Sequence, residues 1–401
     1  MWRYQPVLNA ALTIVLTMGL GALVGACGVM ESGGAGAQGL LVFAWWVALP
    51  CLVVRGLGIG VDFYNDAYVW GYVAAFLILR AVALLAAVGV AWGLHGRGQA
   101  GWCAAYWLAT MWISTIIQGI PILSALLLDD ARGALYGVMA AISSFIFQLP
   151  VMLALFEVDV AQHQQIGARE KAPLGQEGRP PAGDELDSEV QGVGHPVRAL
   201  PSAESSGAQA PRSPWEVLRE ASTWKRIGLR LAVNPVLWAI AAGLVISLST
   251  FGRYLNPASD KFVPELGWVE ATLRWLGDTT SPVGLFCTGL YMAGRGWPSL
   301  SHGFFPRTII LMLAKVVLTP LLMVGIAAGL GLDDTSARAA VVISTLPISL
   351  AGHILAERQF RLTGVAGIAE VVSQTIFFSS VLMLPAVLSW IAVMDALDLF
   401  T

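Results

Sequence analysis

The sequence predicts an all-α polytopic membrane protein, with ten transmembrane helices arranged as two inverted five-helix repeats. Three observations lead to this prediction. Hydrophobic residues make up 56% of the 401-residue chain and charged residues 12%, whereas an ordinary soluble domain carries roughly 25% charge; the mean hydropathy is +0.70. Long apolar runs recur along the chain. Finally, the two halves of the chain carry the same polar motifs in the same order.

The apolar runs predict the membrane spans. A helix needs about 20 apolar residues to cross a bilayer, and ten runs of about this length occur. They cover residues 6–29, 38–57, 68–94, 102–128, 134–157, 231–251, 268–293, 306–331, 336–357 and 364–393. The first run exceeds the apolar core of a cleavable signal, which is about 7 to 15 residues, so we interpret it as a membrane helix.

A hydrophilic segment divides these runs into two groups of five. Residues 158–230 are rich in Pro, Gly, Ser and charge, a composition typical of disordered linkers. The predicted organisation is therefore a first membrane repeat at 1–157, a mostly disordered cytosolic loop at 158–230 and a second membrane repeat at 231–401. Ser213 and Pro214 are placed as a helix start signal before the sixth span.

The halves repeat at a spacing of 230 residues. Ile-Ser-Thr occurs at 113–115 and again at 343–345. The pattern Gly-x5-Ser-x2-Ile-Phe begins at Gly137 and again at Gly367. Because each half has an odd number of spans, the second half must enter the membrane from the opposite side, which predicts inverted repeats of the kind found in secondary transporters.

Lysine and arginine distribution predicts the orientation. Cytoplasmic loops tend to retain positive charge. With the long loop inside, that side holds 14 Lys and Arg residues and the other side holds 7. We therefore expect a multi-pass membrane protein with a cytosolic loop and with both termini on the non-cytosolic side.

Helix breakers next to polar residues mark the fourth and ninth spans. Breaks in a membrane helix survive where protein or a water-filled cavity satisfies the freed backbone groups, and exposed N–H groups at a break suit an anion. The alternative, in which Ser and Thr bond back to helix carbonyls and the prolines merely kink the chain, stays open. The candidate residues that line the crossing are Ser114, Thr115, Gln118, Gly119, Pro121, Ser344, Thr345, Pro347 and Ser349, with Gly352 as a further breaker.

Ionisable residues at membrane depth are functional candidates by default. Arg80 and Lys315 occupy corresponding places in the two halves and are expected to give intramembrane charge or structural support. His353, six residues after Pro347, could accept a proton or simply hydrogen-bond in a pocket. The depth of Glu370 is left open.

Several function classes are disfavoured. The net charge of −3 is small, so no nucleic-acid partner is expected. The four cysteines show neither CxxC nor Cys/His spacing, so neither a metal nor a cofactor is predicted. Gly34, Gly36 and Gly39 spell a dinucleotide fingerprint without the strand that it requires. No GxSxG or HExxH pattern is present, so an enzyme is not expected.

The chain resembles the auxin efflux carrier family, which includes the plant PIN-type carriers. The stretches that carry the resemblance are "QGIPILSALL" (118–127), "WKRIGLRLAVNP" (224–235), "TSPVGLFCTGLYMAGR" (280–295) and "STLPISLAGHILAERQF" (344–360). The resemblance implies the five-plus-five fold shared with bile acid/sodium symporters, and a substrate carboxylate held where the two broken helices cross. It also implies Ser114, Thr115, Gln118, Thr345, Pro347 and Ser349 as the site residues.

This chain departs from the family pattern at two places. Plant carriers have Leu-Pro-Asn-Thr where this chain has Trp112-Ile113-Ser114-Thr115, and an acid in the third span is replaced, with Arg80 where the family has lysine. The expected function is export of an organic anion, an auxin-like carboxylate, by alternating access. The expected partners are that anion and the lipid bilayer. A homodimer is left open, as is the choice between plasma membrane and endoplasmic reticulum in a eukaryotic source.

Two alternatives remain. A sodium- or proton-coupled symporter of small carboxylates or bile-acid-like anions would use the same fold, and would be expected to place carboxylates or clustered carbonyls and hydroxyls at the crossover. A membrane receptor or scaffold, which ranks below it, would use the long loop as its working part.

Overall fold

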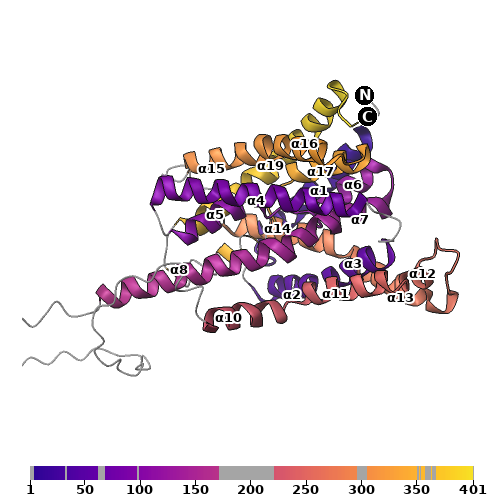
Figure 1. Cartoon of the computed structure of the whole chain (residues 1–401), viewed down its shortest axis with the longest axis horizontal. Helices are drawn as coiled ribbons and strands as arrows, with labels where there is room; N and C mark the ends of the chain where they lie inside the picture. Colours follow the sequence, from indigo (N-terminus) through magenta and orange to yellow (C-terminus); the bar gives the residue numbers. More distant parts are fainter. Residues whose placement is uncertain are drawn as a thin grey trace, which may run out of the picture.

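The computed structural model describes residues 4–31, 34–61, 68–96, 99–170, 221–295, 305–349, 352, 354–356, 363 and 367–400. Within these ranges the regular secondary structure is helical, apart from one isolated antiparallel bridge between Ile113 and Ile348. The helices pack into one bundle, and most of the long ones follow a similar direction (Figure 1).

The chain forms two series of helices, in which η denotes a π- or 3₁₀-helical turn. The first series is α1 (Gln5–Ala26), α2 (Ala35–Phe43), η2 (Ala44–Ala48), α3 (Leu49–Val54), η3 (Arg55–Ile59), α4 (Tyr68–His95), α5 (Ala100–Met111), α6 (Gly119–Leu127), α7 (Asp130–Ser143), η4 (Ser144–Gln148) and α8 (Leu149–Glu170). The second is α10 (Ala221–Ala232), α11 (Pro235–Leu248), α12 (Gly252–Leu255), η5 (Pro264–Leu266), α13 (Gly267–Asp278), α14 (Thr280–Arg295), α15 (Phe305–Leu313), η6 (Ala314–Leu318), α16 (Thr319–Leu330), α17 (Asp334–Thr345) and α19 (Ile368–Ala396).

Six helices of the described chain are long and apolar enough to cross a membrane. They are Gln5–Ala26, Ala35–Ile59, Val69–His95, Arg132–His163, Phe305–Leu330 and Glu370–Ala396. A seventh span results if α10 and α11, which bend by 65° at a short break, are counted as one. These seven overlap seven of the ten predicted runs. The predicted runs 102–128, 268–293 and 336–357 instead fall on shorter helices separated by interruptions.

Three π turns have a common cause in the sequence. The turns η2, η4 and η6 each end two residues before a proline, which is Pro50, Pro150 or Pro320. Proline has no N–H and its ring clashes with the carbonyl four residues earlier, so the helix widens to a π turn before it. The preceding residue then donates to the carbonyl five residues back, as Thr319 does to Ala314. At Pro320 the freed carbonyl of Val316 accepts the indole N–H of Trp390 at 2.8 Å.

The segment predicted as a loop, residues 158–230, is helical at both of its ends. Helix α8 continues through residues 158–170, and α10 begins at Ala221, so both helices enter the segment 158–230. Ion pairs join the two helices there: the Glu157 carboxylate contacts the guanidinium groups of Arg226 and Arg230. The predicted start signal at Ser213 and Pro214 and the predicted disorder of residues 171–220 lie outside the described residues.

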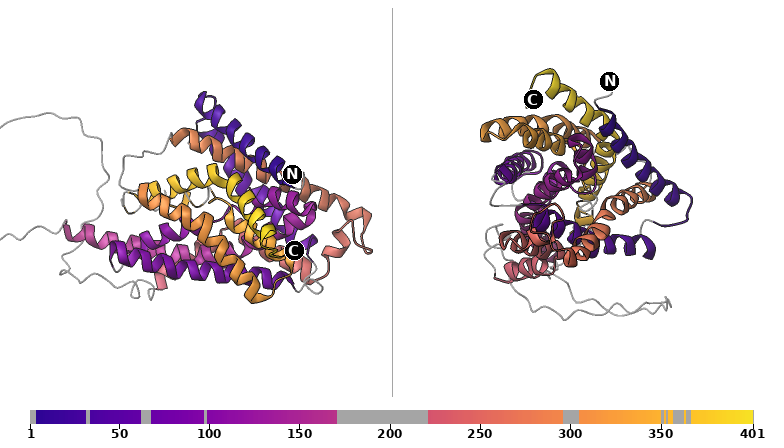
Figure 2. Two further views of the ribbon diagram at one scale, coloured as in Figure 1. Left: turned by 90° about the horizontal axis from the view of Figure 1, so that it is seen from above. Right: turned by 90° about the vertical axis from the view of Figure 1, so that its right-hand side faces the viewer.

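Close packing between α1 and α14 joins the two halves of the chain (Figure 2). Glycines make this approach feasible. A Cβ added at Gly21 would lie 2.1 Å from the carbonyl oxygen of Phe286, and one added at Gly289 would lie 1.8 Å from that of Met18. Both distances are far below van der Waals contact, so these two positions require glycine.

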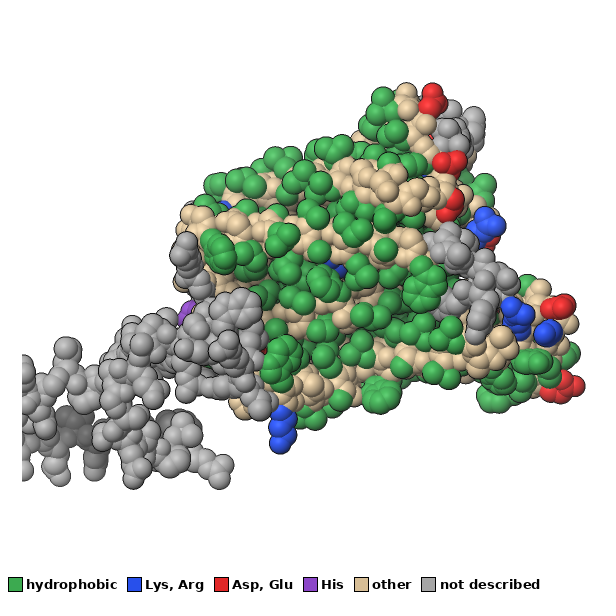
Figure 3. Space-filling model, viewed as in Figure 1, with side chains coloured by type: hydrophobic (Ala, Val, Ile, Leu, Met, Phe, Trp, Pro, Cys, Tyr) green, Lys and Arg blue, Asp and Glu red, His purple; other side chains and the backbone are tan. Residues whose placement is uncertain are grey.

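The outer surface of the bundle is apolar. Large hydrophobic side chains such as Leu16, Leu85, Trp238 and Ile310 are more than half exposed. In the face shown in Figure 3, hydrophobic side chains cover the middle of the bundle and most of the charged side chains gather toward its ends. This distribution is the one expected of helices that face lipid.

We predict that Gly21→Ala destabilises the protein by about 1–3 kcal/mol, the usual cost of overpacking a tightly packed contact. Gly19, on the same helix, is the matched control because a Cβ added there meets no atom within 4 Å. Gly19→Ala should leave stability unchanged or slightly raised, since Ala favours helix over Gly. Thermal unfolding in detergent micelles measures both, and equal melting temperatures would contradict the close packing of α1 on α14.

Candidate functional site

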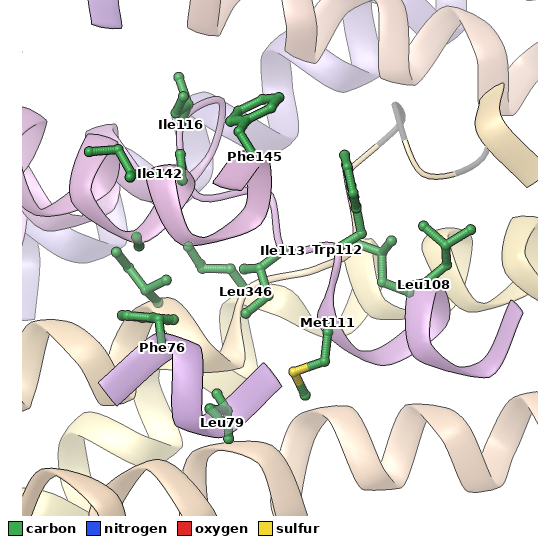
Figure 4. Packing of buried hydrophobic residues seen from close by; sticks show 14 of the residues in the cluster. Phe76, Leu79, Leu108, Met111, Trp112, Ile113, Ile116, Ile142, Phe145 and Leu346 are labelled. Atoms are coloured by element: carbon green, nitrogen blue, oxygen red, sulfur yellow. The ribbon is translucent and has the colours of Figure 1, made fainter. Parts of the chain in front are cut away.

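Two interrupted helices meet at the centre of the described bundle. Helix α5 ends at Met111, residues 112–118 form an extended stretch and a turn, and α6 begins at Gly119. Helix α17 ends at Thr345 and is followed by extended residues 346–349. Figure 4 shows Trp112, Ile113 and Leu346 beside one another at this place. The sequence predicted an interruption in each of these stretches, and both are observed.

Backbone hydrogen bonds join the two interruptions. The N–H of Ser114 donates to the carbonyl of Pro347 at 2.9 Å, and the N–H of Ser349 donates to the carbonyl of Trp112 at 2.8 Å. These bonds form the antiparallel bridge centred on Ile113 and Ile348. The two helices therefore satisfy each other's freed backbone groups, as buried backbone requires.

Proline explains the second interruption but not the first. A residue before proline is driven from the helical region, and Leu346 accordingly has ψ 150. In the first half Pro121 lies in the first turn of α6, where a proline is tolerated. The interruption lies earlier, at residues 112–118, so Pro121 follows the break instead of forming it.

A cavity of about 700 Å³ opens beside the crossing. Its aromatic wall contains Trp45, Trp46, Trp112 and Phe145. Its polar residues are Ser114, Thr115, Ser144, Arg230, Asn234, Thr280 and Ser349. An apolar cavity with a few convergent polar groups is typical of a small-molecule site.

The serine and threonine residues of the predicted site divide into two groups. Ser114, Thr115 and Ser349 line this cavity. Ser344 and Thr345 do not, because their hydroxyls donate back to the α17 carbonyls of Val341 and Val342, at 2.6 and 2.7 Å.

The remaining predicted residues that the structure describes lie at or near the crossing. Gln118 is buried in the turn before α6, and its Oε1 has no hydrogen-bond partner within the described chain. Gly119 begins α6 and packs on Leu346, whose Cδ1 would lie 3.1 Å from an added Cβ. Pro347 accepts the Ser114 bond. His353 lies outside the described residues.

The two buried cations have different roles in the packing. Lys315 donates from Nζ to the carbonyl of Ser344 at 2.8 Å, so it satisfies an acceptor at the broken end of α17. Arg80 instead holds α7 and η4. Its guanidinium donates to the hydroxyls of Ser143 and Ser144, to Gln148 Oε1 and to the carbonyls of Phe76 and Ala140. Because Ser144 lines the cavity, Arg80 fixes part of the cavity wall.

Sequence reasoning missed Thr280. Thr280 is buried among the residues that line the cavity, and its hydroxyl has no hydrogen-bond partner within the described chain. The neighbouring Ser281 donates to the carbonyl of Ile116 at 3.4 Å, which ties the start of α14 to the turn of the first interruption. The stretch "TSPVGLF" supported the family resemblance, but no repeat partner drew attention to Thr280.

Glu370 and the described acidic residues give no metal site. Glu370 accepts from Gln374 Nε2 at 2.7 Å, and Gln374 Oε1 accepts from Thr308. Among the residues placed by the structure, no group of three or more His, Cys, Asp or Glu side chains is suitably arranged to hold a metal ion.

A helical bundle with a lipid-compatible exterior and a partly polar cavity at two broken helices defines a membrane transporter. The comparisons with known proteins agree. A family model described as "Membrane transport protein" matches residues 6–391, so the chain belongs to this family, that of the auxin efflux carriers. It is also 24% identical over 298 residues to "Auxin efflux carrier component 8" of Arabidopsis thaliana, covering 74% of this chain and 72% of the relative.

We predict that Arg80→Lys lowers stability by about 2–4 kcal/mol. A lysine keeps the buried charge but cannot reach the several acceptors that the planar guanidinium bonds, and a hydrogen bond to a charged group is worth about 1.5–3 kcal/mol. Arg274→Lys is the control, since its side chain is 54% exposed and contacts Glu270 only at 3.9 Å. Thermal unfolding of the purified variants compares them, and an Arg80→Lys protein as stable as the control would show that these bonds carry no net stability.

Proposed function

We propose that the protein is a secondary transporter that exports an organic anion, an auxin-like carboxylate, by alternating access at the crossing of its two interrupted helices. The observation that carries the proposal is the cavity of about 700 Å³ beside the bridge between residues 112–114 and 347–349. Membership of the membrane transport protein family and the similarity to an auxin efflux carrier support it.

The proposed architecture is ten spans in two inverted five-helix repeats. Three features support it. The interrupted segments pair antiparallel, as inversion requires. The N-terminal and C-terminal parts lie together, since the Tyr4 hydroxyl donates to the Asp395 carboxylate. The ends of the chain lie at one end of the bundle and the C-terminal part of α8 at the other (Figure 1), as an odd number of spans before the loop predicts.

The cavity chemistry suits an aromatic carboxylate. Trp45, Trp46, Trp112 and Phe145 line the cavity, and aromatic side chains pack favourably against an aromatic body. Ser114, Thr115, Thr280 and Ser349 line the cavity, and a hydroxyl is a donor that a carboxylate accepts. Because the first interruption carries Ser114 where plant carriers have asparagine, the proposal extends to carboxylates other than auxin.

The other predicted residues enter the proposal as parts of the crossing. Gln118, Gly119 and Pro121 shape its first half, and Ser344, Thr345 and Pro347 its second. Lys315 and Arg80 are proposed as supports of the two halves. His353 is proposed as a further polar residue of the second half.

The proposed orientation places the long loop in the cytosol and both termini on the other side, following the positive-inside tendency. Whether the protein forms a homodimer is left open. Transport of labelled indole-3-acetate and of small dicarboxylates into proteoliposomes, with and without sodium or proton gradients, tests the function. Movement of an organic anion is the expected result, dependence on sodium or protons would favour a coupled symporter, and no movement under any gradient would overturn the carrier function.

Thr280→Val provides a sharper test of the site. Valine keeps the shape but removes the unpaired hydroxyl, so we expect the KM for the transported anion to rise about two- to tenfold, the equivalent of a hydrogen bond worth about 0.5–1.5 kcal/mol. Thr375→Val is the matched control, because Thr375 is buried on α19, its hydroxyl donates to Val371 at 2.7 Å, and it does not line the cavity. An unchanged KM for Thr280→Val, or an equal change in the control, would remove Thr280 from the site.

A further inference from the structure

A three-residue ion cluster lies beside the cavity, between α8 and α10. Glu157 on α8 is buried, with its side chain 6% exposed. One carboxylate oxygen contacts Arg226 Nε at 3.1 Å, and the other contacts Arg230 Nη1 at 2.8 Å. We call Glu157, Arg226 and Arg230 the α8/α10 cluster.

The cluster carries an excess positive charge. Two guanidinium groups share one carboxylate, so the formal charges sum to plus one. Either arginine would be enough to neutralise Glu157. A cation that is only partly compensated, in an apolar and partly desolvated setting, attracts anions more strongly than an exposed one.

Only one of the two arginines reaches the cavity. Arg230 lines it, together with Leu229, Val233 and Asn234, whereas Arg226 does not. Among the described residues that line the cavity, Arg230 is the only one with a charged side chain. The Arg230 side chain is also 33% exposed, so the surrounding protein does not enclose it.

Arg230 has hydrogen-bonding capacity to spare. A guanidinium has five N–H donors arranged to match a carboxylate. The contact with Glu157 is made by Nη1, and no other partner of this guanidinium is found within the described chain. Among the described residues none occupies its remaining donors, and these are the donors that a ligand in the cavity would use.

We propose that Arg230 is a capture site for the carboxylate of the transported anion, at the α10 wall of the cavity, and that the anion passes from it to the crossing. The inference rests on the proposed function and adds a residue that neither the repeat symmetry nor the broken helices indicated. Glu157 positions the guanidinium of Arg230, while Arg230 itself contacts the anion.

The cluster supplies its own matched control. Arg230→Gln and Arg226→Gln each remove one cation from Glu157, so a purely structural role of the ion pairs predicts similar effects of both. Capture predicts a difference, because only Arg230 faces the cavity. Initial rates of labelled indole-3-acetate transport in proteoliposomes, measured over a range of concentrations at low and high salt, distinguish the two.

We expect Arg230→Gln to raise KM about tenfold at low salt, to change the maximal rate less than twofold, and to weaken the dependence of KM on salt. Arg226→Gln should raise KM less than threefold. Equal KM values for the two variants, or an effect of Arg230→Gln confined to the maximal rate, would overturn the capture site while leaving the carrier function intact. Absence of transport by the unmodified protein would instead overturn the proposed function, and with it the capture site.

Discussion

The reciprocal backbone bonds at the crossing are the constraint on which the rest of the structure depends. An unpaired N–H or carbonyl in a membrane interior costs several kcal/mol, and two helices that stop at the same depth leave several such groups. The bonds from Ser114 to Pro347 and from Ser349 to Trp112 pair four of them. The pairing requires close approach, which small residues permit: a Cβ at Gly137 would lie 3.1 Å from the carbonyl of Thr115, and one at Gly352 would lie 3.3 Å from the Trp112 ring.

The two halves end their broken helices by different means. In the second half Pro347 stops α17, and Lys315 satisfies the carbonyl of Ser344. In the first half the carbonyl of Ser114 accepts the amides of Gln118 and Gly119 within the turn, so no cation is needed there. Arg80 is consequently available to fix η4, whose Ser144 forms part of the cavity wall. Approximate sequence symmetry thus coexists with distinct local chemistry.

The sequence predicted the helical membrane class, the family and the two interruptions, because composition and the repeated Ile-Ser-Thr motif are properties of the chain itself. It could not predict which hydroxyls face the cavity. Ser and Thr in a helix can turn to solvent or bond back to a carbonyl, and Ser344 and Thr345 do the latter while Ser114 and Thr115 line the cavity. It also missed Thr280 and Arg230, which reach the cavity because α14 contacts the first interruption and α10 packs on α8. Asp159 fell within the predicted loop, yet it is buried, since the Gly101 amide donates to its carboxylate.

The most direct test of the central claim is an experimental structure, by electron cryomicroscopy, of the protein with bound indole-3-acetate or another carboxylate that it transports. The account predicts helices interrupted at 112–118 and at 346–349, with ligand density in the cavity beside Ser114, Thr115 and Thr280. A continuous helix through either interruption, or a ligand bound away from this cavity, would contradict it.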